Sequence, residues 1–242
     1  MIPLVHDFTG RTVLVLGGGA VGARKARRFA SEAHVVVVSP AFADGFDAAD
    51  AAEATPETWQ QTSDGPGVEL VCDAPTPEGV ERWIDRLDPA LVVAATDDEA
   101  INAAAADAAR DRDVLVNRTD RAGGRGGDVG SVVVPATVED GSVTVAITTG
   151  GASPALSKHL RERLEAEIEG TGAMADLTRD LRAELRDRAL SPTERRDAVR
   201  RVVRSSRVWK ALRTGTTNAR RVAEDVIGTD TTRTPESEGG EP

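Results

Sequence analysis

The chain has 242 residues, a formal net charge of −10 at pH 7 and 40% hydrophobic residues. This length is enough to bury a sizeable core in one large domain or two small ones, and no apolar run is long enough to cross a bilayer, so we expect no membrane partner. The acidic balance argues against non-specific binding to nucleic acid and fits a halophilic source.

The chain begins with a lead-in, MIPLVHDFTG, that lacks the basic and long apolar regions of a signal peptide. We therefore expect a cytoplasmic protein. A strand, a glycine turn, a helix and a second strand are predicted next, because two short apolar, β-branched runs flank a segment with helical spacing. These elements are predicted at Thr12–Leu16, Ala20–Ala30 and Val35–Val38.

The glycine turn contains the spacing G-x-G-x-x-G at Gly17, Gly19 and Gly22. The first glycine permits a tight turn, the second lets the backbone approach a pyrophosphate, and the third lets the helix pack close to the strand. The free N–H groups at the helix start attract phosphates. Because the motif follows a strand and opens a helix, it favours dinucleotide binding. The alternative is a Rossmann-like core whose glycines serve packing only.

The choice of nucleotide depends on the end of the second strand, where an Asp or Glu usually holds the adenosine ribose. This chain has Ser39 and Pro40 there. Ser39 can hydrogen-bond a ribose hydroxyl, although more weakly than a carboxylate. No Arg stands beside it to hold a 2′-phosphate, so NAD is favoured over NADP modestly.

Further strands and helices alternate up to Asn117, which predicts a parallel sheet with right-handed crossovers. An acidic stretch, Ala41–Gly67, holds six acids and no Lys or Arg and is interpreted as a solvated helix and loop. The strands that follow are predicted at Val68–Cys72, Ala90–Ala95 and Asp113–Asn117, and the helices at Thr76–Leu87 and Glu99–Arg110. The single cysteine, Cys72, excludes an intramolecular disulfide.

After Asn117 the pattern changes to a loop rich in Gly and Arg, residues 118–130, and then to a hairpin and helices. The hairpin strands are predicted at Ser131–Ala136 and Ser142–Thr148, with a turn at Glu139–Gly141, and a helix at Ser153–Ile168. We expect a Rossmann domain at 1–117, a region with the loop and the hairpin at 118–152, a helical domain at 153–227 and a disordered acidic tail at 228–242.

Four blocks of sequence together resemble one family, the precorrin-2 dehydrogenases, which include the dehydrogenase half of sirohaem synthases. They are GGGAVGARKA, VVAATDDEAIN, VLVNRTD and VPATVEDGSVTVAITTGGASPALSKHLRERLE. The resemblance implies an α/β fold with a Rossmann-type parallel sheet, a small β dimerisation region and a helical C-terminal domain. It also implies a homodimer that uses NAD to oxidise precorrin-2 to sirohydrochlorin. Some members of the family also insert iron.

The resemblance implies roles for individual residues. The family's proposed catalytic aspartate corresponds to Asp120, and a turn-capping role is its alternative interpretation. The implied cofactor-binding residues are Gly17, Gly19, Ala20, Val21, Gly22, Ser39, Pro40, Thr96 and Asp97. The implied substrate-binding residues are Asn117, Arg118, Arg121, Thr149, Gly150, Ser153, Lys158 and His159. The chain departs from the family's D-F-[IV]-x-P motif, where Gly130-Ser131-Val132 stands.

The substrate implied by the resemblance carries eight carboxylates, so a pocket for it needs cations, and Arg guanidinium groups suit carboxylates. The Arg, Lys and His residues near Asp120 and after Ser153 meet this need, with solvated surface charge as the alternative. No Cys/His cluster has metal-binding spacing, so we expect no metal. One other function remains open, an NAD(H)-sensing regulatory module without catalysis. The segment Thr171–Arg221 has a local charge of +8, but the acidic remainder of the chain and the near-absence of aromatic residues argue against nucleic-acid binding, so we expect no nucleic-acid partner. Insertion of iron or cobalt is also left open.

Overall fold

The computed structural model describes residues 3–47, 51–63, 65–120 and 130–228. The chain divides into two compact units. The first comprises Met1–Val134 with Gly150–Ser153, and the second comprises Pro135–Thr149 with Pro154–Pro242. The predicted four-part division at residues 117, 152 and 227 stays a prediction. Among the described helices, none combines the length and the apolar character needed to cross a bilayer.

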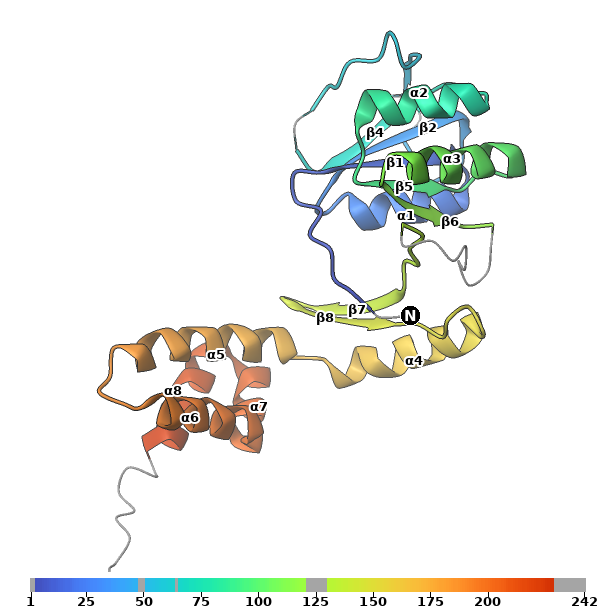
Figure 1. Cartoon of the computed structure of the whole chain (residues 1–242). Helices are drawn as coiled ribbons and strands as arrows, with labels where there is room; N and C mark the ends of the chain where they lie inside the picture. Colours follow the sequence, from blue (N-terminus) through green and yellow to red (C-terminus); the bar gives the residue numbers. More distant parts are fainter. Residues whose placement is uncertain (1–2, 48–50, 64, 121–129, 229–242) are drawn as a thin grey trace, which may run out of the picture. The chain divides into compact units, whose positions relative to one another are not determined.

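The first unit is built on a six-stranded sheet with the order β3-β4-β2-β1-β5-β6 (Figure 1). All neighbouring strands are parallel. The strands are β1 (Thr12–Gly18), β2 (His34–Phe42), β3 (Ala52–Glu53), β4 (Gly67–Cys72), β5 (Leu91–Ala94) and β6 (Leu115–Arg118). The strand order reverses at β1, between β2 and β5, and ligands of such sheets bind at the carboxyl ends of the strands beside this point.

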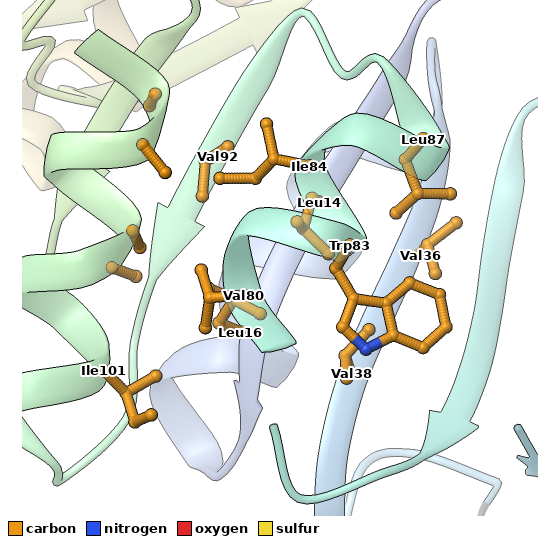
Figure 2. Close-up of a cluster of buried hydrophobic side chains, with 14 of the residues drawn as sticks. Leu14, Leu16, Val36, Val38, Val80, Trp83, Ile84, Leu87, Val92 and Ile101 are labelled. Carbon is orange, nitrogen blue, oxygen red and sulfur yellow. The ribbon is translucent and has the colours of Figure 1, made fainter. Parts of the chain in front are cut away.

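Helices cover both faces of the sheet, as the apolar strands without alternation predict. On one face α1 (Ala20–Phe29) packs on Val13, Val15 and the side chains around them. On the other face lie α2 (Pro77–Leu87) and α3 (Glu99–Asp111). Figure 2 shows the core beneath these two helices, where the fully buried Trp83 lies among Leu14, Val36 and Val38.

The second unit joins a two-stranded antiparallel hairpin to a set of helices. Its elements are β7 (Ala136–Asp140), β8 (Val143–Ile147), α4 (Pro154–Glu167), α5 (Thr171–Arg186), α6 (Pro192–Arg204), α7 (Ser206–Thr214) and α8 (Thr216–Gly228). Val138 and Ile147 of the hairpin pack with Ile168 and with apolar side chains of α4. A separate core joins α5, α6, α7 and α8 through Leu181, Val202 and their neighbours.

The fold class is confirmed: a Rossmann-type parallel sheet is followed by a small antiparallel strand pair and a helical C-terminal region. The predicted helix starts are also confirmed. Asp98 caps α3 with its carboxylate on the N–H groups of Ala100 and Ile101. Ser191 forms a capping box with Glu194 at the start of α6. These signals are local, so the sequence displays them directly.

The predicted hairpin is wrong in its first strand and its turn. Ser131 forms a bridge with Val116 of β6, and the N–H of Val132 donates to the carbonyl of Val116. The first hairpin strand starts only at Ala136, and the turn consists of Gly141 and Ser142, with Gly141 at a φ of +56°. The apolar run after the loop therefore extends the first unit instead of forming the hairpin.

The prediction of a helix in the acidic stretch, Ala41–Gly67, is also wrong. Its described residues contain the short strand β3 and turns, and none of them lies in a helix. Glu53 of β3 pairs with Cys72 of β4, which in turn pairs with Ser39 of β2. Part of the stretch thus forms the edge of the sheet, at the level where its neighbouring strands end.

Candidate functional site

At the end of β1, Gly17 and Gly22 lie so close to neighbouring backbone atoms that neither position has room for a side chain. Gly17 has a φ of +110°, and a Cβ there would lie 2.5 Å from the carbonyl oxygen of Ala95, just beyond β5. A Cβ on Gly22 would overlap the carbonyl oxygen of Gly17. The first and third glycines therefore let β1 approach both the end of β5 and helix α1, as the motif predicts.

Gly19 differs from these two glycines because the space beside it is open. It has a φ of −74°, and a Cβ there would meet nothing within 4 Å. It is the N-cap of α1, whose first turn carries no acidic residue and no side-chain cap. The exposed Ala20 and Val21 follow it. The first N–H groups of a helix lack partners within the helix and favour anions, so this cradle fits the pyrophosphate of a dinucleotide.

The residues at the end of β2 differ in how they could contact a nucleotide. Ser39 is 6% exposed, and its hydroxyl donates to the carbonyl of Ala41 at 2.7 Å. That hydroxyl can therefore still accept a hydrogen bond from a ribose but has its own proton engaged. Pro40 is exposed and lines a cavity of about 470 Å³, which Cys72 and Asp73 at the end of β4 also border.

The turn after β5 is held by a buried amide. Asn102 is 1% exposed, and its Oδ1 accepts from the backbone N–H of Thr96 at 3.2 Å and from its hydroxyl at 2.9 Å. Its Nδ2 donates to the carbonyl of Thr96 at 2.9 Å. The neighbouring Asp97 is exposed. These bonds fix the backbone of Thr96 beside the glycine turn, because Ala95 is the residue that Gly17 approaches.

The predicted catalytic residue, Asp120, follows β6 and is held by two contacts. Thr119 donates from both its N–H and its hydroxyl to the carbonyl of Ala94 in β5, at 3.0 and 3.2 Å. The Arg118 guanidinium donates to both oxygens of Asp120, at 3.1 Å from Nε and 2.5 Å from Nη2. Their side chains are 10% and 27% exposed, respectively. The Asp120 carboxylate is thus fixed near the ends of β5 and β6.

The electrostatics of this pair follow from its geometry. The hydrogen bonds that Arg118 donates to the Asp120 carboxylate raise the pKa of Arg118 above its ordinary value, and the charges of Asp120, Glu99 and Asp107 add to that effect. A guanidinium in a bidentate pair stabilises the ionised carboxylate. Arg118 therefore holds Asp120 charged and oriented, and its Nε and one Nη2 donor are already committed to this pair.

The other predicted substrate-binding residues are more scattered. Asn117 is 6% exposed, and its Nδ2 donates to the carbonyl of Val132 at 2.8 Å, which anchors the segment after the loop. Gly150 and Ser153 belong to the first compact unit, whereas Thr149 belongs to the second. Arg121 lies outside the described residues.

The predicted cations of α4 are in the second unit and on its surface. Lys158 has a side chain that is 73% exposed, and its Nζ lies 3.9 Å from the Glu162 carboxylate. His159 is also exposed. Thr149 precedes α4, and its hydroxyl lies 3.1 Å from the hydroxyl of Ser157 in that helix. Roles for these residues in substrate binding stay predictions.

Sequence reasoning missed two polar residues of the site, Asn102 and Asp73. The signal for Asn102 is a buried amide six residues after Thr96, in a helix that otherwise presents Ala and Ile to the core. Asp73 comes directly after a short apolar strand, as ligand-binding residues of such sheets do. Its importance depends on neighbours from β2 and β3, which the linear sequence does not reveal.

Two families match the chain. The one described as "Putative NAD(P)-binding" matches residues 4–136, and the one described as "Sirohaem biosynthesis protein central" matches residues 140–167. The first match covers the whole described sheet. The glycine cradle therefore lies in a domain of a nucleotide-binding family.

Several named proteins are similar to this chain. A precorrin-2 dehydrogenase of Methanosarcina barkeri is 30% identical over 215 residues, which cover 87% of this chain and 86% of that protein. A sirohaem synthase of Stutzerimonas stutzeri is 32% identical over 233 residues, which cover 94% of this chain and 44% of that protein. The chain thus spans less than half the length of the sirohaem synthase.

A solved structure shares the fold. The structure named "SirC, precorrin-2 dehydrogenase" superposes with a TM-score of 0.63 at 22% identity, over 93% of this chain and 98% of that chain. At this identity the likeness establishes the fold. It covers the sheet, the hairpin and the helical region together.

Proposed function

Because this chain belongs to the family of precorrin-2 dehydrogenases and sirohaem synthases, we propose that it oxidises precorrin-2 to sirohydrochlorin with NAD. The observation that carries this proposal is the open cradle at Gly19, at the point where the strand order reverses. Asp120 follows β6, two strands from β1 at the same edge of the sheet, and its neighbour Thr119 is bonded to Ala94 of the intervening β5. A pure packing role for the glycines would not require an open side at the helix start.

The residues of the cradle would hold the cofactor. The N–H groups at the start of α1 would bind the pyrophosphate, and Thr96, fixed by Asn102, would border the nicotinamide side. Bound NAD supplies the hydride acceptor, and the protein contributes its position. The rigid turn at Thr96 limits the positions that a ring beside it can take.

Asp120 would act as the general base. Its carboxylate is held ionised by Arg118, so it is able to accept a proton from the substrate. Arg118 then gains a second role, because it keeps the base oriented while its remaining donors face the carboxylates of a tetrapyrrole. The residues that bind the rest of the substrate are proposed to include Lys158 and His159 of α4.

An assay of purified protein tests this proposal directly. We expect the absorbance of precorrin-2 to change to that of sirohydrochlorin only when NAD is present, with one NADH formed per substrate. The Gly19→Asp variant serves as a control, since it should fold but not turn over. Binding of NAD without any turnover of precorrin-2 would contradict the proposal and favour a regulatory NAD(H)-sensing module instead.

A further inference from the structure

We propose that Asp73, with Glu53 beside it, makes the nucleotide site selective for NAD over NADP. This inference rests on the proposed function, because it concerns the same cofactor. In many nucleotide-binding sheets an acid at the end of β2 performs this task, but β2 of this chain has Ser39 and Pro40 in that place. The structure places a carboxylate at the end of the neighbouring strand.

Three strands end at one level and bring these residues together. Ser39 of β2 pairs with Cys72 of β4, and Cys72 pairs with Glu53 of β3. Asp73 comes directly after Cys72, and its N–H donates to the carbonyl of Ser39 at 3.3 Å. Neighbouring strands are ~5 Å apart, so Asp73 stands about one strand from the usual position of the acid, and Glu53 about two.

The cavity of about 470 Å³ at these strand ends has room for a nucleoside, and its lining is acidic. Pro40, Glu53 and Asp73 border it, and none of the described residues that line it is basic. Ser39 and Ala41 also lie against the glycine turn, because a Cβ on Gly18 would overlap the carbonyl oxygen of Ala41. Pro40, which lines the cavity, stands between these two residues in the chain, so the cavity and the glycine turn border the same end of β2.

The Asp73 carboxylate is fixed in position. Its Oδ2 accepts from the indole Nε1 of Trp83 at 2.7 Å, and Trp83 is completely buried. Its Oδ1 has no hydrogen-bond partner within the described part of the chain and is available to a ribose hydroxyl. An additional phosphate on that ribose would bring a charge of the same sign close to this fixed carboxylate, which weakens NADP binding.

Binding of a 2′-phosphate by Arg27 is the competing arrangement, and it would favour NADP. This residue lies on α1 beside Gly45, where its guanidinium atoms would be 3.8–3.9 Å from an added Cβ. It does not line the cavity. If its guanidinium received a 2′-phosphate, the wild-type protein would prefer NADP, so the same measurement distinguishes the two arrangements.

The test compares the dissociation constants of NADH and NADPH by fluorescence titration, without substrate and at low ionic strength. We expect the wild-type protein to bind NADPH ~10-fold or more weakly than NADH, as repulsion between charges a few ångströms apart implies. Asp73→Asn should bring the two constants within about 3-fold of each other, mainly by strengthening NADPH binding. Glu53→Gln should have the same effect to a smaller degree, because Glu53 lies farther away.

A stability measurement and a control variant separate an effect on nucleotide selectivity from an effect on the fold. Asp73→Asn keeps an oxygen that accepts from Trp83, so a change in the nucleotide ratio without loss of thermal stability separates selectivity from a structural role. Glu57→Gln is the matched control: Glu57 lies in the same segment, pairs with Arg82 at 3.0 Å and does not line the cavity. Its ratio should equal that of the wild type.

The contrary outcomes are distinct. Equal wild-type affinities, a preference for NADPH, or an unchanged ratio in the double variant of Asp73 and Glu53 would each overturn the selectivity while leaving NAD binding intact. Failure of the folded wild-type protein to bind either nucleotide would instead overturn the proposed function, and the selectivity with it.

Discussion

At the scale of single residues, the pair of Asp120 and Arg118 combines two opposing requirements. A general base must be ionised before it acts, and the bidentate guanidinium ensures this. The same guanidinium loses its ionic partner once the carboxylate takes a proton. A base in this setting accepts the proton for a short time and then releases it to solvent, which the exposed portion of Asp120 permits.

Replacement of Asp120 by Asn tests its role as a base. The variant keeps the size and an oxygen for Arg118 but cannot accept a proton. Since general-base catalysis contributes about 10²–10⁴-fold, we expect kcat for precorrin-2 oxidation to fall by that factor while the affinity for NAD changes little. Stopped-flow absorbance with saturating substrate measures the first quantity and calorimetry the second.

Asp197→Asn is a suitable control, because Asp197 is an acid of α6 in the second unit that pairs with Arg200. Its rate should match that of the wild type. A rate for Asp120→Asn that stays near the wild-type value would remove Asp120 from the mechanism and leave it a turn-capping role, which Asn also performs well.

Lys25 of α1 gives the first unit a pH-dependent stability. Burial, together with the smaller effect of the charges of Arg24 and Arg28, lowers the pKa of Lys25 from 10.5 to about 8. Below about pH 8 the folded state carries the buried charge. Between that pH and the ordinary value near 10.4 the unfolded state binds more protons, so the free energy of unfolding should rise with pH.

Urea unfolding at pH 8, 9 and 10 measures this rise. The Lys25→Met variant keeps most of the apolar stem but has no titrating group, so its unfolding midpoint should vary less with pH than that of the wild type. Exposed Lys210→Met provides the control. Identical pH dependences in the wild type and Lys25→Met would show that burial of Lys25 does not limit stability.

At the scale of elements, substitutions at two glycines of the turn after β1 should have different effects, one on NAD binding and one on stability. Gly19→Asp meets open space but places a negative charge where the pyrophosphate would bind, so NAD binding should be abolished in a folded protein. Gly22→Ala places its Cβ against the carbonyl oxygen of Gly17, so the turn must move and the unfolding temperature should fall.

Calorimetry with NAD and thermal unfolding followed by circular dichroism separate the two effects. Gly65→Asp is the control for added charge, since a Cβ there also meets nothing within 4 Å. An unchanged affinity for NAD in Gly19→Asp would place the pyrophosphate elsewhere.

The sequence predicts those elements whose signals are local. Thr76, Asp98 and Ser191 mark helix starts because a capping side chain and its N–H partner lie within three residues of each other. The segment from Ser131 was assigned to the hairpin because its β-branched run has the composition of a strand. Its backbone bonds go instead to Val116, fifteen residues earlier, and no local pattern encodes that choice.

The residues of the candidate site likewise divide into those with a local sequence signal and those without one. The close approaches of Gly17 and Gly22 follow from their spacing in the motif, so the sequence alone predicts them. The roles of Asn102 and Asp73 arise from contacts with Thr96 and with Ser39, which depend on how strands and helices pair. The hydrogen bond from the Ser39 hydroxyl to the carbonyl of Ala41 is likewise not encoded in the pattern that predicts Ser39 as a ribose ligand.

At the scale of the whole molecule, the hairpin of β7 and β8 leads us to predict a homodimer. Two strands alone are seldom stable as a sheet, and Thr144 and Ala146 are exposed on β8. We expect the hairpin of β7 and β8, residues 136–147, to pair across a two-fold axis with a second copy, so light scattering at micromolar concentration in high salt should give twice the mass of the chain.

Substitution of the exposed Ala146 by Asp tests the same surface, because buried like charges across a two-fold axis repel. It should shift the mass toward that of one chain. Thr62→Asp, at an exposed position of the first unit, is the control and should leave the mass unchanged. A monomeric wild type would contradict the prediction.

The central position of β1 has a consequence for amide hydrogen exchange. Val13, Leu14, Val15 and Leu16 are fully buried and lie between β2 and β5. Their amides should exchange only when the first unit unfolds completely. NAD at 100 times its dissociation constant should therefore slow their exchange by about 100-fold. Exchange in α5–α8, measured in the same sample, would reveal whether the second unit gains any of that protection.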